Sequence, residues 1–98
     1  MAGYETISIG DGVGYVEFDV LALVTDADYS WSAEAVLQRK SDGARFYVTD
    51  GGCSCNGFGE YLTVADLKPI HRMSEAYRMT DDPERLRKSY RAKATEYR

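Results

Sequence analysis

The sequence predicts an α+β fold in which a small antiparallel sheet of three to four strands is followed by C-terminal helices. Apolar and polar residues alternate within residues 15–24 and 29–49, as expected of strands with one buried face. After residue 80, a helix start signal precedes an apolar stripe with helical spacing. A chain of 98 residues suits one domain with one modest core.

The first clear strand is predicted over residues 15–24. Leu21 and Leu23 interrupt its polar side, so we expect both faces to be covered at that end. Residues 4–9 alternate in the same way and predict a short edge strand. The apolar positions expected to share one face of the longer strand are Val16, Phe18, Val20, Ala22 and Val24.

A β-hairpin is predicted at about residues 29–49. Residues 29–39 and 44–49 both alternate, and Ser41-Asp42-Gly43 lies between them. The Asp-Gly step accepts the positive φ that a tight hairpin turn requires. These residues therefore predict two antiparallel neighbours in the sheet.

Residues 50–59 contain four glycines and no periodicity, which predicts a loop whose backbone takes conformations closed to other residues. Residues 63–66, Thr-Val-Ala-Asp, resemble a capping box with Asp in place of Glu. They predict a short helical turn that Pro69 ends. The β-rich part of the chain, including the Gly/Cys loop, is thus expected to span residues 1–70.

Residues 71–98 predict a basic helical segment, either within the same domain or as an extension of it. One helix is expected from Ile70 to Met79, and residues 80–84 predict the start of a second, with capping residues, Pro in the first turn and an acid beside it. The apolar stripe of the second helix consists of Leu86, Tyr90, Ala94 and Tyr97.

Charge is divided sharply along the chain. Residues 1–67 hold eleven Asp/Glu and three Lys/Arg, a net −8, whereas residues 68–98 hold nine Lys/Arg and five Asp/Glu, a net +4. We expect the basic tail to pack on its own acidic body, and the sequence pI near 4.9 argues against nucleic acid as the partner. No apolar run approaches the ~18 residues that span a bilayer, so we expect a cytosolic protein without membrane contact.

A set of short motifs runs through about half of the chain. Tyr-Ser opens a strand at residue 29, Thr49-Asp50 leads into Gly-Cys-Ser-Cys at residues 52–55, and Phe58 and Asp-Leu-Lys-Pro at residues 66–69 follow. With these motifs the chain resembles a family of small uncharacterised proteins encoded by actinobacterial phages. The resemblance implies a phage origin, and with it the host cytoplasm, but no established activity.

Cys53, Cys55 and His71 are of the residue types that bind Zn²⁺ in a tetrahedral site. A single residue between the cysteines is shorter than zinc sites commonly use, so the alternative is that both thiols pack as small hydrophobes and no cofactor is bound. A disulfide between residues this close needs a strained ring, and we expect two thiols in a reducing compartment. A thiol enzyme is a further reading, although no cation near in the sequence activates either cysteine.

The sequence contains no recognisable catalytic set, so we expect a non-enzymatic accessory protein that binds a host or phage protein. A homodimer is a second expectation, because the stripe of the last helix is self-complementary. The alternative function is a small metal-binding module whose basic helix contacts nucleic acid. The candidate partner-binding residues are Trp31, Tyr47, Phe58, Arg85, Lys88, Tyr90, Arg91 and Tyr97.

Overall fold

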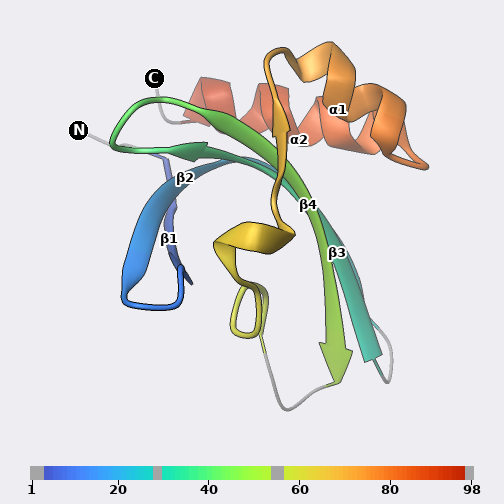
Figure 1. The fold of residues 1–98 in the computed structure, drawn as a ribbon. Coiled ribbons are helices and arrows are strands. Elements are labelled where there is room, and N and C mark those ends of the chain that lie inside the picture. Colours follow the sequence, from blue (N-terminus) through green and yellow to red (C-terminus); the bar gives the residue numbers. More distant parts are fainter. Residues whose placement is uncertain (1–3, 28–29, 54–56, 97–98) are drawn as a thin grey trace.

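The computed structural model describes residues 4–27, 30–53 and 57–96 and confirms the α+β fold (Figure 1). Five strands form one antiparallel sheet in the order β1-β2-β3-β4-β5, one strand more than the largest number expected. Two C-terminal helices cover one face of the sheet. The elements are β1 (Thr6–Gly10), β2 (Tyr15–Ala27), β3 (Ser30–Arg39), β4 (Arg45–Cys53), the 3₁₀ turn η1 (Val64–Asp66), β5 (Lys68–Ile70), α1 (Met73–Met79) and α2 (Pro83–Glu96).

A β-bulge in β2 divides the strand between two cores. The register with β3 shifts between Val20 and Ala22, so that Leu21 is the extra residue. One added residue turns every following side chain to the other face. The expectation of a single apolar face over residues 16–24 is therefore wrong beyond Val20, because Ala22 and Val24 pack on the opposite side. The expectation that both faces are covered at this end is confirmed.

The first core lies on the face of the sheet that the segment 57–67 covers. Its two phenylalanine rings, of Phe18 and Phe46, meet edge to face with centroids 5.8 Å apart. Its buried side chains are Ile9, Phe18, Val20, Ala35, Leu37, Phe46, Val48 and Leu67.

The second core lies on the opposite face, beneath α1 and α2. Ala76 from α1 and Leu86 from α2 are both fully buried there. Each helix is short, and its apolar side must find tertiary cover to be stable. The buried side chains of this core are Leu21, Ala22, Val24, Val36, Tyr47, Ile70, Ala76 and Leu86.

The β3–β4 hairpin is confirmed, and it is longer than the sequence predicted. Gly43 in its turn has φ +76°, and Asp42 Oδ1 accepts a hydrogen bond from the backbone N–H of Ala44 at 3.1 Å. The strand β4 continues to Cys53, so the loop predicted over residues 50–59 is wrong in its first part. Gly51 permits the close pairing there, because a Cβ at this position would lie 3.1 Å from the carbonyl oxygen of Trp31.

The starts of the helical elements follow the capping signals. The backbone N–H of Thr63 donates to Asp66 Oδ2 at 2.8 Å, which confirms the capping box at η1. Asp82 Oδ1 accepts from the backbone N–H of Arg85 at 3.2 Å at the start of α2. The helix expected from Ile70 begins only at Met73, because Ile70 pairs with β4 as part of β5. No helix of the described residues is long and apolar enough to span a membrane.

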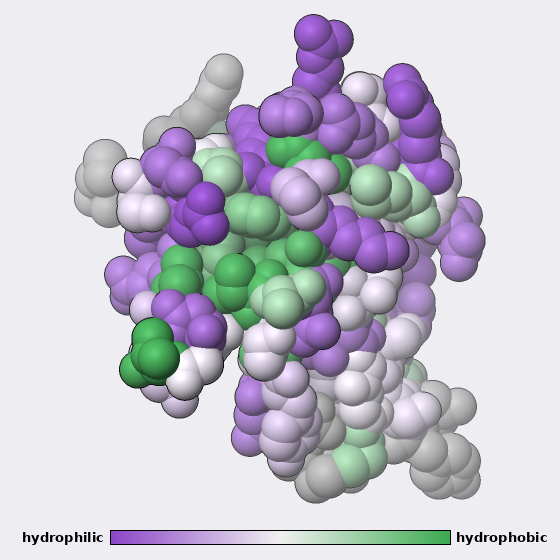
Figure 2. All heavy atoms as spheres, viewed as in Figure 1, coloured by the Kyte–Doolittle hydropathy of each residue, from purple (hydrophilic) through white to green (hydrophobic). Residues whose placement is uncertain are grey.

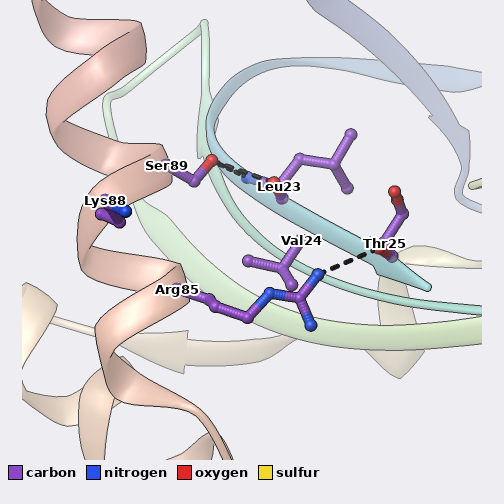
Figure 3. Close-up of a pocket in the computed structure, with 6 residues that line it drawn as sticks. All are labelled: Leu23, Val24, Thr25, Arg85, Lys88 and Ser89. Carbon is purple, nitrogen blue, oxygen red and sulfur yellow. Dashed lines mark hydrogen bonds between the residues drawn. The ribbon is translucent and has the colours of Figure 1, made fainter.

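Helix α2 covers the part of β2 that β1 leaves without a neighbour. The pairing of β1 with β2 extends along β2 only to Asp19. Farther along β2, Ser89 Oγ accepts a hydrogen bond from Leu23 N at 2.8 Å and donates one to Leu23 O at 2.9 Å. Figure 3 shows Ser89 and Arg85 reaching from α2 to this edge, where Arg85 donates to the carbonyl oxygen of Thr25 at 3.2 Å. Backbone groups that could pair with another chain are thereby occupied.

The basic tail packs on the acidic body, as the charge division predicts. Arg85 Nη1 lies 3.0 Å from Asp26 Oδ1, and Lys93 Nζ lies 3.7 Å from Glu5 Oε1. Both pairs join residues of α2 to residues near or within the N-terminal strands. Carboxylates of the body therefore pair with part of the positive charge of the tail.

Candidate binding surface

The aromatic residues proposed as partner-binding do not form one surface. Tyr47 is only 5% exposed and packs in the second core, where it offers no surface to a partner. Trp31 is half-buried, and its Nε1 donates to the carbonyl oxygen of Cys53 at 2.9 Å. Phe58 packs against the first core and Tyr90 against the second, on opposite faces of the sheet. Tyr97 lies outside the described residues.

Burial also changes the chemistry of Tyr47. Its hydroxyl donates to Glu34 Oε1 at 3.2 Å. Burial, together with the negative charge of Glu34, raises the pKa of Tyr47 to about 12. The phenol is thus held neutral, which suits a structural role for this side chain.

The candidate cations all lie on α2, away from the exposed aromatic residues described below. Arg85 is occupied by Asp26 and the Thr25 carbonyl, whereas Lys88 and Arg91 are exposed. Lys88 lines an open cavity of about 410 Å³ between α2 and β2 (Figure 3). No aromatic side chain lines that cavity among the described residues.

The residues proposed as metal ligands do not fit a metal centre in this structure. Cys53 is disulfide-bonded, so the expectation that it is a free thiol is wrong, and a disulfide sulfur does not supply the thiolate that Zn²⁺ binds. His71 is exposed, and its backbone N–H donates to Glu75 Oε2 at 2.9 Å. Cys55 lies outside the described residues. In the part of the chain that is described, no three His, Cys, Asp or Glu residues are grouped to hold a metal ion.

Three of the four large apolar side chains that are exposed among the described residues lie away from the helices, and the fourth, Met79, belongs to α1. Val13 is 97% exposed, Tyr15 79% and Tyr61 73%, and they come from the β1–β2 turn and the segment after β4. Figure 2 shows apolar residues gathered on this face, between the β1–β2 end and η1. Exposed apolar side chains that occur together mark interaction sites more often than those that occur singly.

Two cavities open beside Tyr15. The first, of about 410 Å³, runs between β1 and the segment 57–62, and we call it the edge groove. The second, of about 530 Å³, lies between the β1–β2 end and the β3–β4 turn. The edge groove is lined by Ile7, Ser8, Gly10, Tyr15, Phe58, Gly59, Glu60 and Leu62.

The β1–β2 turn is held in shape by Asp11. Its Oδ1 accepts hydrogen bonds from the backbone N–H groups of Val13 at 3.0 Å and Gly14 at 2.8 Å. These two bonds favour the charged carboxylate and lower the pKa of Asp11. Gly12 in the same turn has φ +100°, and the tight turn leaves Val13 projecting into solvent.

The opposite wall of the edge groove is fixed by contacts with β4 and β1. Asp50 Oδ2 accepts from the backbone N–H of Gly59 at 2.8 Å, which ties the segment to β4. Glu60 Oε2 accepts from the backbone N–H of Gly57 at 3.0 Å. An isolated parallel bridge between Gly10 and Thr63 then closes one end of the groove. Both walls are thus preformed.

The surroundings of the edge groove are acidic. The two segments that flank it, residues 4–17 and 57–67, contain five carboxylates and no Lys or Arg. Lys40 on the neighbouring turn is paired with Asp19 at 2.5 Å, and Lys93 of α2 lies 3.7 Å from Glu5. The five carboxylates are Glu5, Asp11, Glu17, Glu60 and Asp66.

The alternation patterns did not predict this surface, because residues 10–14 lie between two predicted strands and show no periodicity. The signal was present, since Val13 is an apolar residue with a glycine on each side and no alternating partner. Of the groove residues, only Phe58 was among the proposed partner-binding set. The tyrosines at positions 15 and 61 could not be told from the others without their exposed fractions.

Comparison with known proteins gives one match. A family model described as "Domain of unknown function (DUF7574)" matches residues 15–97, which is most of the chain and includes everything from β2 to the end of α2. The strand β1 precedes the matched region. No curated protein and no solved structure matches the chain.

Proposed function

We propose that this chain, which belongs to the DUF7574 family, is a non-enzymatic accessory protein that acts by binding another protein through the edge groove and the apolar residues around it. Phage origin and action in the host cytoplasm, which the motif resemblance implies, are part of the proposal. The observation that carries it is the exposure of Tyr15, which lines a preformed groove, and of Val13 and Tyr61 in the two segments that flank this groove.

Physical chemistry supports binding at this surface. Aromatic residues are enriched in protein interfaces, because a rigid ring buries a large area and loses little conformational entropy. Tyrosine is enriched among the few interface residues whose truncation costs about 2 kcal/mol or more of binding free energy. Tyr15, which lines the groove, and Tyr61, which lies in the chain between the lining residues Glu60 and Leu62, have most of their surface still available for such burial.

The lining of the groove also favours binding over chemistry. Among the described residues that line the groove, Glu60 carries the one carboxylate. The other lining residues are apolar, carry a phenol or a hydroxyl, or are glycines. A hydrolytic or transfer site needs a nucleophile within hydrogen-bond reach of a base. Glu60 instead accepts a bond from the backbone of Gly57, which gives it a structural partner.

The test compares the proteins that the intact chain and two variants retain from an actinobacterial lysate. Tyr15→Ser combined with Tyr61→Ser removes the ring that lines the groove and the exposed ring in the segment that forms its opposite wall. Lys88→Ser combined with Arg91→Ser is the matched control on exposed α2 positions. We expect one protein to be retained by the intact chain and by the helix variant, and to be lost with the groove variant.

The opposite pattern counts against the proposal. Retention by the groove variant together with loss in the helix variant would assign the function to α2. Nuclease treatment of the lysate then separates a nucleic-acid partner from a protein partner, because a complex held through nucleic acid disappears on digestion. Loss of the partner from neither variant would equally overturn binding at the groove.

A further inference from the structure

The outer edge of β1 carries backbone groups that the sheet does not use. The backbone N–H of Val20 donates to the carbonyl oxygen of Glu5 at 2.8 Å, which fixes the alternation of the β1–β2 ladder. Ile7 and Ile9 therefore bond toward β2, and Thr6 and Ser8 turn their N–H and C=O groups outward. Among the described residues, the isolated Gly10–Thr63 bridge is the only pairing on this outer side.

The edge groove lies along this same edge. Ile7 and Ser8 from β1 line one side of it, and Phe58 and Leu62 line the other. A strand added beside β1 would point alternate side chains toward the face that carries Ile7 and Ile9. Those side chains would meet the groove, whereas the side chains between them would meet the exposed face of Thr6 and Ser8. The site thus suits a chain with period-two alternation.

The acidic surroundings of the groove favour basic residues at the polar positions of the added strand. Glu17 lies opposite Ser8 in the β1–β2 register and so shares the face that the polar side chains would meet. The flanking segments as a whole hold five carboxylates and no Lys or Arg, and of the five only Glu5 has an ion pair, with Lys93, among the described residues. Complementary charge across an interface speeds association and excludes wrong partners, and like charge opposes binding. A strand with Lys or Arg at alternate positions meets this requirement.

The same charges argue against a second copy of the chain as the occupant. Two β1 strands paired antiparallel about Ser8 would set Glu5 of each copy opposite Asp11 of the other, at both ends of the pairing. Like charges directly opposite each other destabilise a strand pair. The Gly10–Thr63 bridge further shortens the edge that a second copy could use.

We propose that the partner contributes an extended segment of alternating basic and apolar residues, which adds as a strand to the free edge of β1 and places its apolar side chains in the edge groove. This inference rests on the protein-binding function proposed above and names the chemistry of the partner. Strand addition of this kind obtains affinity from main-chain hydrogen bonds and specificity from alternate side-chain pockets.

The probe is a short synthetic peptide of alternating Lys and Val, compared with the matched peptide of alternating Glu and Val. Each is titrated into the isotope-labelled intact chain, and backbone amide signals are followed by NMR. We expect the Lys-Val peptide to bind at least about tenfold more tightly at low salt and to weaken as salt is added. Amide exchange at Thr6 and Ser8 should slow on binding, because those N–H groups become bonded.

Two variants separate the backbone contact from the charge. Ser8→Pro removes an outward N–H, a place where an edge strand tolerates proline, and should weaken binding by about tenfold or more. Glu17→Lys with Glu60→Lys leaves that backbone group in place and should reverse the peptide preference. Glu84→Lys on α2 is the matched control and should leave binding unchanged. Unfolding by urea checks that each variant is folded.

Equal affinity for the two peptides, no binding of the Lys-Val peptide at low salt, or amide shifts confined to α2 would each overturn strand addition. These outcomes differ from a failure of the proposed function. A lysate protein that is lost with the Tyr15/Tyr61 variant but retained by Ser8→Pro leaves protein binding intact and removes only the strand mode.

Discussion

At Gly59 the backbone takes φ +85°, and a Cβ built there would lie 2.5 Å from Ile7 Cδ1. Both facts restrict the position to glycine, since left-handed φ strains other residues and the side chain of Ile7 already fills the space. Gly59 thereby lets the segment after β4 approach β1 closely. This close approach is one of the contacts that shape the edge groove, together with the bond from Gly59 N–H to Asp50 and the Gly10–Thr63 bridge.

Gly59→Ala should lower the free energy of unfolding by about 1–3 kcal/mol through backbone strain and the clash together. Adding Ile7→Val, which removes Cδ1, should relieve the clash and leave the strain, so that the alanine costs less in that background. Urea unfolding of the four proteins measures both terms. Gly57→Ala is the matched control, because nothing lies within 4 Å of its Cβ position. An equal loss at both glycines would contradict the close approach.

Tyr47 predicts how stability depends on alkaline pH. Burial, and after it the charge of Glu34, raises its pKa from 10.0 to about 12 in the folded chain. The folded state therefore favours the neutral phenol, and this contribution is complete below pH 10 and is lost as pH rises from 10 to 12. Urea midpoints across that range should fall more steeply for the intact chain than for Tyr47→Phe.

The matched control for Tyr47 is Tyr15→Phe, which removes an exposed phenol. With this variant, the urea midpoint should fall with rising pH as steeply as it does for the intact chain. Tyr77 contributes in the same direction, because burial raises its pKa as well, so only the difference between variants isolates Tyr47. A Tyr47→Phe slope that matches the intact chain would show that the phenol titrates alike in both states.

Among the elements, α2 acts as the cover of an open sheet edge. Ser89 satisfies both the N–H and the C=O of Leu23, at 2.8 and 2.9 Å. Removing one partner of a shielded hydrogen bond leaves the other without compensation. The helix is thus tied to β2 by hydrogen bonds as well as by its apolar side.

Ser89→Ala should lower the free energy of unfolding by about 1–3 kcal/mol, because two backbone groups of Leu23 lose their partner beneath α2. Lys88→Ala, the exposed neighbour on the same helix, should change it by less than about 0.5 kcal/mol. Chemical unfolding in urea measures both. The role assigned to Ser89 fails if the two substitutions cost the same.

The elements also show which features the sequence predicts. Alternation and turn chemistry give the strands and the hairpin, because the Asp42-Gly43 step and the side-chain period are local properties. The bulge at Leu21 is not local, since it depends on which face of β2 each core needs. The same holds for β4 beyond residue 49, where the strand continues by pairing with β3. Glycine suits this pairing because a Cβ at Gly51 would lie 3.1 Å from the carbonyl oxygen of Trp31. Tertiary pairing decides both.

For the molecule as a whole, the charge division predicted that the tail would pack on the body. It did not predict where the candidate binding surface lies. Long-range pairs such as Arg85 with Asp26 follow from opposite charge. The candidate surface depends instead on the exposed fractions of individual side chains, and Tyr47 and Tyr15 are alike in sequence terms but are 5% and 79% exposed. Exposure is set by the assembled fold, so the sequence alone cannot show which of its eight tyrosines are exposed.

The body–tail attraction can be measured through the Arg85–Asp26 pair. Its side chains are 46% and 67% exposed, so we expect a coupling of only about 0.2–1 kcal/mol. Arg85→Asp should destabilise the fold at low salt by placing two acids together, and adding Asp26→Arg should recover the part that belongs to the pair. Raising the salt concentration should shrink that recovery, because the charges become screened.

Lys88→Asp is the control that makes this test decisive. It changes the net charge of the chain as Arg85→Asp does, but at an exposed position with no ion pair among the described residues. If total charge governs stability, the two single variants cost the same and Asp26→Arg recovers both equally. If the contact between body and tail governs it, only the Arg85 variant is recovered, because only that side chain reaches Asp26 and the edge of β2. We expect the second result.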